Sequence, residues 1–324
     1  MRLFGVSMVC NEADVVEAFV RHNLAVLDGL IVVDHGSIDG TSEILAKLQA
    51  EGLPLRVMRE PEPAYRQSAT MTRLAREALA QDAADFVFAL DADEFLKLDA
   101  RATLERALSE VPAGTHAVMH WLTYVPDAFE GCPGAFGPGH LWWRLKTERR
   151  RLFKVIVGRG LLERLEDTVA MGNHCVRGPD KVAPRPHARL RQDVVALAHC
   201  PVRSRSQLKG KIIVGYLAHL ATQPQDRRLA GHWRDLYAEL RAGADLPEER
   251  LREIACNYGV PAKMAQSPSA IELVEDPVAL AIEQRYCVDV VPDPLQLLMC
   301  FTEALIAAEQ QRLGAASAPR YYTL

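Results

Sequence analysis

The sequence predicts an α/β protein with a Rossmann-like, mostly parallel sheet flanked by helices and followed by a helical C-terminal extension. The first observation is that short apolar runs alternate with longer amphipathic ones through the first 125 or so residues, which is typical of βαβ units. The second is that helical spacing dominates from residue 203 onward. The third is size and composition: 324 residues, 49% hydrophobic and 25% charged, suffice for a globular core and exclude a disordered or disulfide-stapled chain.

The strands expected in the N-terminal part are short and apolar, and they cover residues 3–9, 30–33, 55–58, 86–90 and 117–124. Amphipathic stretches between them predict helices near residues 12–27, 41–51, 66–81 and 100–110. Apolar strands that alternate with helices pair in parallel, with helices covering both faces of the sheet.

The rest of the chain reads as a loop-rich middle and a helical end. Residues 131–139 have loop composition, and residues 194–198 predict one more strand. Amphipathic segments predict helices near 204–222, 226–242, 247–257, 270–284 and 293–313. We therefore expect a catalytic or binding domain over residues 1–212 and a helical region over 213–324.

Polar residues follow the expected strands at the points where those strands end. They occupy positions 10–12, 34–41, 60 and 65–67, and 91–94. Because ligands of parallel sheets bind beyond the carboxyl ends of the strands, we expect these groups to meet at one rim and form a site.

Asp91 and Asp93 are the centre of that expected site. At strand spacing, residues two apart face the same way, so two carboxylates would lie side by side at the end of an apolar strand. Such a pair is unfavourable without a nearby cation, and oxygen ligands suit Mg²⁺ or Mn²⁺. Glu94 follows immediately and adds a third carboxylate at the end of this strand. The alternative is two exposed turn aspartates that cap the helix expected near residue 100.

The segment 34–41 follows a buried strand and opens a helix. Gly36 and Gly40 permit a tight turn, and Asp39 is suited to cap the helix. The functional interpretation is a nucleotide pocket in which Asp34 accepts hydrogen bonds from a base or ribose; the alternative is an ordinary strand–helix loop. Neither a dinucleotide-binding GxGxxG spacing nor a P-loop is present.

Further candidates lie elsewhere in the chain. His199 ends an apolar strand and His174 lies in a short polar run, so either imidazole would complete a metal site, although a lone histidine is more often structural. Arg66 and Arg73, with Gln67, precede the Asp91 strand by one helix and would contact phosphate or base, or else form a solvated helix face.

Charge is unevenly distributed along the chain. The net charge is -4, yet residues 144–211 hold 17 Lys and Arg against six Asp and Glu. This basic middle suits an anionic ligand or a solvated face, whereas the acidic remainder argues against nucleic acid. Seven cysteines without CxxC spacing, no signal peptide and no long apolar run predict a cytoplasmic protein without a transmembrane segment.

Taken in order, these motifs resemble glycosyltransferases of the family 2 type. The runs that carry the resemblance are residues 8–14 (MVCNEAD), 32–41 (VVDHGSIDGT) and 89–96 (ALDADEFL), and they are similar to a branch shared by family-2-like and family-92-like domains. The later run 199–204 (HCPVRS), with Gln207 and Lys209 after it, is similar to an HY.vRS…K segment of that branch. The resemblance covers roughly residues 3–212.

The resemblance implies a GT-A fold and a nucleotide-diphosphate-sugar donor, with a UDP-sugar favoured. It implies Mn²⁺ or Mg²⁺ held by Asp93 and His199, with His174 as a weaker candidate, and it places Asp91 against the metal or the ribose. The residues expected to contact the nucleotide are Asn11, Glu12, Asp34, Ser37, Asp39, Arg66, Gln67, Arg73 and Asp91. Asp167, by analogy with the helix-start base of the family, and Glu94 are the candidate catalytic carboxylates.

The expected reaction is therefore metal-dependent hexosyl transfer to a saccharide or other hydroxyl acceptor. A base would deprotonate the acceptor while the metal offsets charge on the leaving diphosphate, so direct displacement inverts the anomeric centre. The chain lacks the (E/Q)xxRW signature of processive synthases, which favours single addition. A nucleotidyltransferase on a related sheet and a non-catalytic nucleotide- or sugar-binding scaffold are the alternatives.

Overall fold

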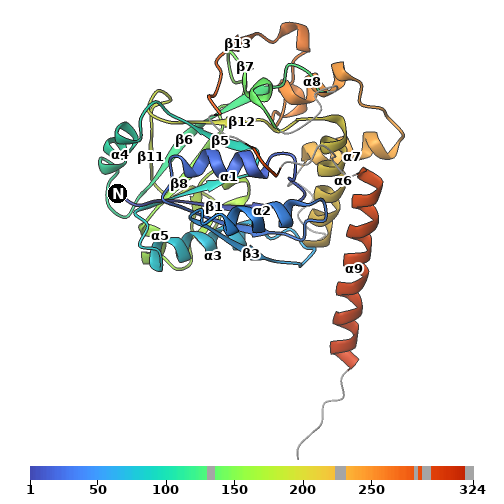
Figure 1. The fold of residues 1–324 in the computed structure, drawn as a ribbon, viewed down its shortest axis with the longest axis horizontal. Helices are drawn as coiled ribbons and strands as arrows, with labels where there is room; N and C mark the ends of the chain where they lie inside the picture. The colour runs from blue at the N-terminus through green and yellow to red at the C-terminus, as the bar shows by residue number, and fades with distance from the viewer. Residues whose placement is uncertain (130–135, 223–230, 281–283, 287–292, 318–324) are drawn as a thin grey trace, which may run out of the picture.

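A computed structural model describes residues 1–129, 136–222, 231–280, 284–286 and 293–317. Four strands form the parallel half of its main sheet, in the spatial order β4 (Phe86–Leu90), β1 (Leu3–Val9), β2 (Gly29–Asp34) and β3 (Leu55–Arg59). All four were expected from the sequence, and their pairing confirms the predicted parallel arrangement (Figure 1).

The other half of the sheet is mixed. β8 (Phe153–Gly158) runs antiparallel between β4 and the long β6 (His116–Val125), so β6 points the same way as the parallel strands. The remaining strands of this sheet are β5 (Glu94–Lys97), β7 (Trp143–Leu145), β11 (His187–Arg189), β12 (Ala196–His199) and β13 (Leu273–Glu275). A separate small ribbon pairs β9 (Thr168–Val169) with β10 (Val176–Arg177).

Helices cover both faces of the sheet, as predicted for an α/β fold. α1 (Val16–Leu24), α2 (Thr41–Ala50) and α4 (Arg101–Ser109) pack on one face, where Phe19, Leu45 and Leu104 are buried in one core cluster. α3 (Gln67–Ala80) and α5 (Gly160–Glu163) pack on the opposite face, where Met71 and Leu161 belong to a second cluster.

The C-terminal part is mainly helical, as expected. It contains α6 (Arg205–Thr222), α7 (Gly231–Arg241), α8 (Glu248–Cys256) and α9 (Pro294–Ser317). Short 3-10 turns complete the described chain: η1 (Pro138–Leu141), η2 (Met171–Asn173), η3 (Ala262–Met264) and η4 (Pro268–Ala270). A third core cluster joins α6, α7 and α8 to β6 and β7 through residues such as Leu208, Leu236, Leu251 and Val125.

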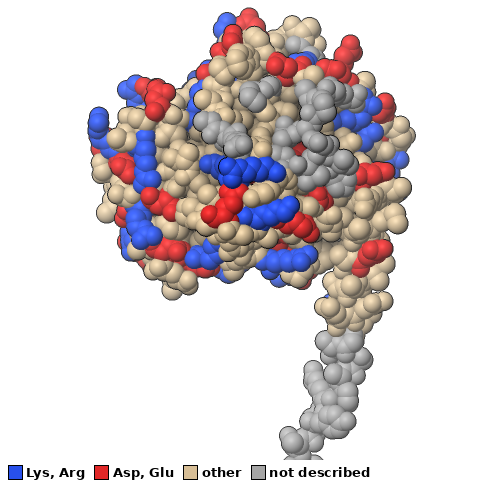
Figure 2. Space-filling view, viewed as in Figure 1, with Lys and Arg blue, Asp and Glu red and all other residues tan. Residues whose placement is uncertain are grey.

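The long helix α9 packs against α6 near its start and then extends away from the body (Figure 1). Charged side chains of both signs are mixed over the body, whereas the extending helix is mostly uncharged (Figure 2). Leu295, Met299, Ile306 and Leu313 are exposed along it. Among the described helices, none combines the length and apolar character needed to cross a membrane.

One predicted helix is wrong. Instead of a helix over residues 270–284, the described chain has η4 and then β13, which pairs antiparallel with β7 so that Leu273 lies opposite Leu145. Pro277 lies in the middle of the expected helix, where it lacks the N–H that the helix requires. The predicted domain boundary after residue 212 lies inside α6, and the division into two domains stays a prediction.

Candidate active site

The loops after β1 and β2 lie together and are joined by hydrogen bonds. The Asn11 backbone N–H donates to Ser37 Oγ (2.9 Å), and the Ile38 N–H donates to Asn11 Oδ1 (2.9 Å). The Asp39 carboxylate accepts from the Ala13 N–H (2.9 Å) and the Thr41 N–H (3.0 Å). These polar side chains therefore meet at one rim, as predicted, and there they fix the shape of the two loops.

Asp34 lies beneath those loops and is 1% exposed. Its Oδ1 accepts a hydrogen bond from the Ser37 N–H (2.9 Å), and its other oxygen accepts from the hydroxyl of Ser42. The carboxylate thus holds the turn that begins α2, which is the role that the sequence also allowed as the alternative to ribose binding.

Asp91 begins the loop after β4, and its carboxylate has three partners from three different segments. Oδ1 accepts from Gln67 Nε2 (3.1 Å) and Asn173 Nδ2 (3.0 Å), and Oδ2 pairs with the Lys154 ammonium. The side chain is still 30% exposed. Gln67 also accepts from the Gly172 N–H (2.8 Å), so it ties η2 to Asp91.

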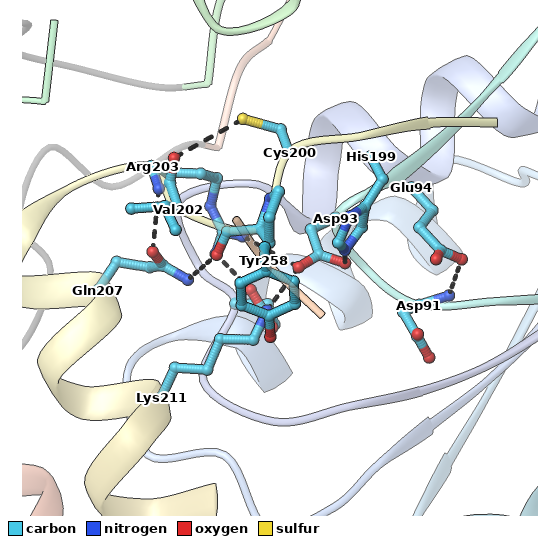
Figure 3. A network of polar contacts seen from close by, with 12 residues as sticks. Asp91, Asp93, Glu94, His199, Cys200, Val202, Arg203, Gln207, Lys211 and Tyr258 are labelled. Carbon is cyan, nitrogen blue, oxygen red and sulfur yellow. Dashed lines mark hydrogen bonds and ion pairs between the residues drawn. The ribbon is translucent and has the colours of Figure 1, made fainter. Parts of the chain in front are cut away.

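Lys154 and Glu94 form the buried floor beside Asp91. The Lys154 side chain is 1% exposed and the Glu94 side chain is fully buried, and the two groups lie 2.8 Å apart. Glu94 also accepts from the Asp91 N–H (2.9 Å; Figure 3). Burial raises the pKa of Glu94 to about 8, because desolvation outweighs the opposing charge of Lys154.

Asp93 is 3% exposed and faces a separate set of groups. Its Oδ2 lies 2.5 Å from Lys211 Nζ and 3.9 Å from Arg203 Nη1, and its Oδ1 lies 3.5 Å from His199 Nε2 (Figure 3). Burial opposes ionisation, but Lys211, His199 and Arg203 together hold the pKa of Asp93 well below its usual value.

Arg203 connects this group to the first loop. It is 1% exposed, and its guanidinium forms a two-point ion pair with Asp14 (2.6 and 2.9 Å) while it also contacts Glu12. Burial raises the pKa of Glu12 to about 7 even though Arg203 opposes the shift.

Aromatic rings line the same region. His199 lies against Trp121 (ring centroids 4.2 Å apart, edge to face) and near Tyr258 (5.6 Å), and Lys211 Nζ lies 5.9 Å from the Tyr258 ring centroid. His174 stacks on Trp121 at 5.8 Å, and desolvation by burial lowers the pKa of its imidazole to about 4. A cation site here would therefore have a water-poor, partly aromatic wall.

Three predicted residues lie in other surroundings. Arg66 is exposed, and Arg73 pairs with Glu60 (3.6 Å) and Glu77 (4.0 Å) along the surface of α3. Asp167 is buried between Arg185 (2.6 and 2.8 Å) and Arg164 (3.2 Å). The catalytic role of Asp167 and the nucleotide contacts of Arg66 and Arg73 remain predictions. The contacts described above do not join these three residues to Asp91 or Asp93.

The donor set around Asp93 fits a divalent cation held by few protein ligands. The described residues contain no group of three or more His, Cys, Asp and Glu that would cage an ion. Asp93 Oδ1 and His199 Nε2, however, face each other across 3.5 Å, and Mg²⁺-like ions bind through one or two protein ligands plus phosphate oxygens.

Charged groups of both signs surround this site. The carboxylates of the cluster are Glu12, Asp14, Asp91, Asp93 and Glu94, and its cations are Lys154, Arg203 and Lys211. The carboxylates outnumber the cations, but burial raises the pKa of Glu94 to about 8 and that of Glu12 to about 7, so protons on these two groups bring the cluster close to electrical balance at pH 7. Asp91 fits the role of metal ligand less well than Asp93, because two amides and Lys154 already satisfy its oxygens.

Lys154, Arg203 and Lys211 are absent from the predicted site. Lys209, the lysine that the motif resemblance singled out, instead lies 3.5 Å from the exposed Asp245. A signal was available: Gln207 and Lys211 are four residues apart, a spacing that places both on one helix face, and Arg203 lies just before that helix. Lys154 likewise is the one charged residue in the apolar run 153–158.

The N-terminal part of the chain matches one family of known proteins. Residues 6–154 match the family described as glycosyl transferase family 2. No curated protein matches the chain.

Similar solved structures include a mannosyltransferase from Pyrobaculum calidifontis in complex with GDP-Man and Mn²⁺ (17% identity, 81% of each chain covered, TM-score 0.39). Another is glucosyl-3-phosphoglycerate synthase from Mycobacterium tuberculosis with Mn²⁺, UDP and glucosyl-3-phosphoglycerate (21% identity, 37% of this chain and 43% of that chain, TM-score 0.25).

Proposed function

Residues 6–154 carry a glycosyl transferase family 2 domain, which makes this chain a glycosyltransferase, and from that premise we propose its donor site and reaction. The enzyme uses a nucleotide-sugar, for which we propose a UDP-sugar, and adds one sugar to a hydroxyl acceptor with inversion. Asp93 and His199 hold a Mn²⁺ or Mg²⁺ ion. The observation that carries this proposal is the buried Asp93–His199 pair, in which a carboxylate oxygen and an imidazole nitrogen face each other across 3.5 Å.

Each residue of the cluster has a role in this proposal. The ion, when bound, offsets the charge that develops on the departing diphosphate. Arg203 holds the first loop in place through Glu12 and Asp14, so the loop is ordered before the donor arrives. Asp91, the partly exposed carboxylate, faces the ribose or the sugar, while Lys154 and Gln67 keep it oriented.

The direct test is nucleotide binding with and without metal. We expect UDP, among UDP, GDP, CDP and TDP, to raise the melting temperature of the protein, with a larger shift when Mn²⁺ is present. Asp93→Asn removes the charged metal ligand, so the Mn²⁺-dependent part of the shift should disappear. Asp245→Asn, which removes an exposed carboxylate outside the cluster, is the matched control and should retain it.

Two outcomes would contradict the proposal. A protein that no nucleoside diphosphate stabilises has no donor site of this kind. Retention of the full Mn²⁺-dependent shift in folded Asp93→Asn would place the ion elsewhere. Release of UDP from a UDP-sugar in the presence of acceptor mixtures then separates turnover from binding alone.

A further inference from the structure

Lys211 occupies an unusual position for a lysine on a helix surface. It projects from α6 to the buried Asp93, where its ammonium lies 2.5 Å from Oδ2 (Figure 3). Asp93 is 3% exposed and the Lys211 side chain 20% exposed. A positive charge from the C-terminal part of the chain is thus placed directly on the carboxylate that we propose as a metal ligand.

A divalent ion bound by Asp93 would face strong competition from that ammonium. The ion would bind between Asp93 Oδ1 and His199 Nε2, on the same carboxylate that pairs with Lys211 through Oδ2. Two cations on one buried carboxylate repel each other, and the carboxylate stabilises each of them less than it would stabilise one alone.

Lys211 is held by fewer ion pairs, and is more exposed, than the other cations of the cluster. Lys154 bridges two carboxylates and is 1% exposed, and Arg203 is fixed by Asp14 and Glu12 at the same degree of exposure. Among the residues that the structure describes, Lys211 has one acidic partner at ion-pair distance, and its flexible four-carbon side chain lies near the Tyr258 ring.

We propose that Lys211 exchanges partners during donor binding. In the empty site it neutralises Asp93; when the metal ion and the nucleotide bind together, it moves to the diphosphate. This inference rests on the proposed function and adds a coupling between its two ligands. Lys211 weakens metal binding while it pairs with Asp93, and it is unavailable to the nucleotide for the same reason, so the binding of either ligand strengthens the binding of the other. The coupling is reciprocal, because linkage requires the two affinities to change by the same factor.

The test measures Mn²⁺ affinity, by the electron paramagnetic resonance signal of free Mn²⁺, with and without saturating UDP. In the wild type we expect weak Mn²⁺ binding that UDP strengthens by about 5- to 150-fold, the usual range of such coupling. Lys211→Met removes the competing charge, so Mn²⁺ alone should bind more tightly than to the wild type, and the strengthening by UDP should shrink. UDP binding measured in EDTA should weaken.

Lys209→Met is the matched control. It lies on the same helix two residues away, pairs with the exposed Asp245, and should leave both Mn²⁺ affinities at wild-type values. Lys211→Arg retains the charge, so Mn²⁺ alone should bind it no more tightly than the wild type. Lys211→Gln is a second neutral variant, and urea unfolding of each protein establishes that it is folded before titration.

The proposed exchange of partners by Lys211 is wrong if Lys211→Met or Lys211→Gln is folded and binds Mn²⁺ no more tightly than the wild type. An undiminished UDP effect in these variants also overturns it. The two proposals fail separately: if no nucleoside diphosphate binds the wild type, the proposed function is lost, whereas the titrations with Mn²⁺ alone still decide whether Lys211 competes for Asp93.

Discussion

At the scale of single residues, the site depends on charges buried in pairs. Lys154 is the clearest case, because its ammonium is the only cation at ion-pair distance from both Asp91 and Glu94 in the described part of the chain. A buried charge is costly unless it is paired, so removing the lysine leaves two carboxylates without their cation.

We therefore expect Lys154→Met to lower the free energy of unfolding by about 3–5 kcal/mol, measured by urea denaturation at pH 7. Lys146→Met is the control, since Lys146 and Glu272 form an exposed pair (60% and 71%) that should contribute about 0–1 kcal/mol. Equal losses in the two variants would mean that the cluster around Asp91 is not built on its ion pairs.

At the scale of elements, α6 connects the sheet to the C-terminal helices. Two of its glycines lie where those helices approach: a Cβ on Gly210 would lie 2.6 Å from a methyl group of Leu297 in α9, and a Cβ on Gly215 would lie 2.8 Å from the Trp233 ring of α7. Trp233 in turn packs on Tyr65, which follows β3. The absence of a side chain at these two glycines thus lets α9 and α7 pack closely on α6.

Gly215→Ala tests this packing through the sign of its effect. In an open helix the substitution stabilises by about 0.5–1 kcal/mol, because alanine loses less conformational entropy than glycine. Against the Trp233 ring we expect the opposite, a loss of about 1–3 kcal/mol from overpacking. Urea unfolding followed by tryptophan fluorescence measures it, and a stabilised variant would show that α7 does not pack closely here.

At the scale of the whole molecule, carboxylates with lowered pKa values join segments far apart in the sequence. Asp28 pairs with Arg101 of α4, Asp167 with Arg185, and Asp276 with Arg144 beside β13. Burial opposes ionisation of each carboxylate, but hydrogen bonds from these arginines outweigh it and lower each pKa below its ordinary value of 3.8.

A lowered carboxylate pKa contributes stability that is present above the unfolded value and is lost as the pH falls through the folded value. We therefore expect the protein to lose stability below about pH 4, as the unfolded chain takes up protons that the folded chain does not. Asp167→Asn should be destabilised at pH 7 and should show a shallower decline than the wild type between pH 4 and pH 3 in thermal unfolding. If the stability of the variant and of the wild type fell equally steeply with pH, Asp167 would contribute nothing to the acid sensitivity.

Sequence patterns alone predict the parallel half of the sheet and the rim where its loops meet. Apolar runs such as 86–90 and 30–33 bury both faces of a strand, so their alternation with helices leaves few other folds. Because parallel strands end on the same side, it followed that Asn11, Ser37 and Asp91 would lie at one rim. Asp93 and His199, predicted as metal ligands, lie 3.5 Å apart.

The partners of those residues depend on how the whole chain folds. Lys154 and Lys211 are 63 and 118 residues from the carboxylates they reach, and no local pattern specifies contacts at that separation. The same holds for β13, whose residues follow a helical spacing in the sequence but pair with β7 across the molecule. Local spacing determines which secondary structure each segment can form alone. Which carboxylate pairs with which cation depends on burial and on contacts between distant segments, because the fold of the whole chain sets the positions of both groups.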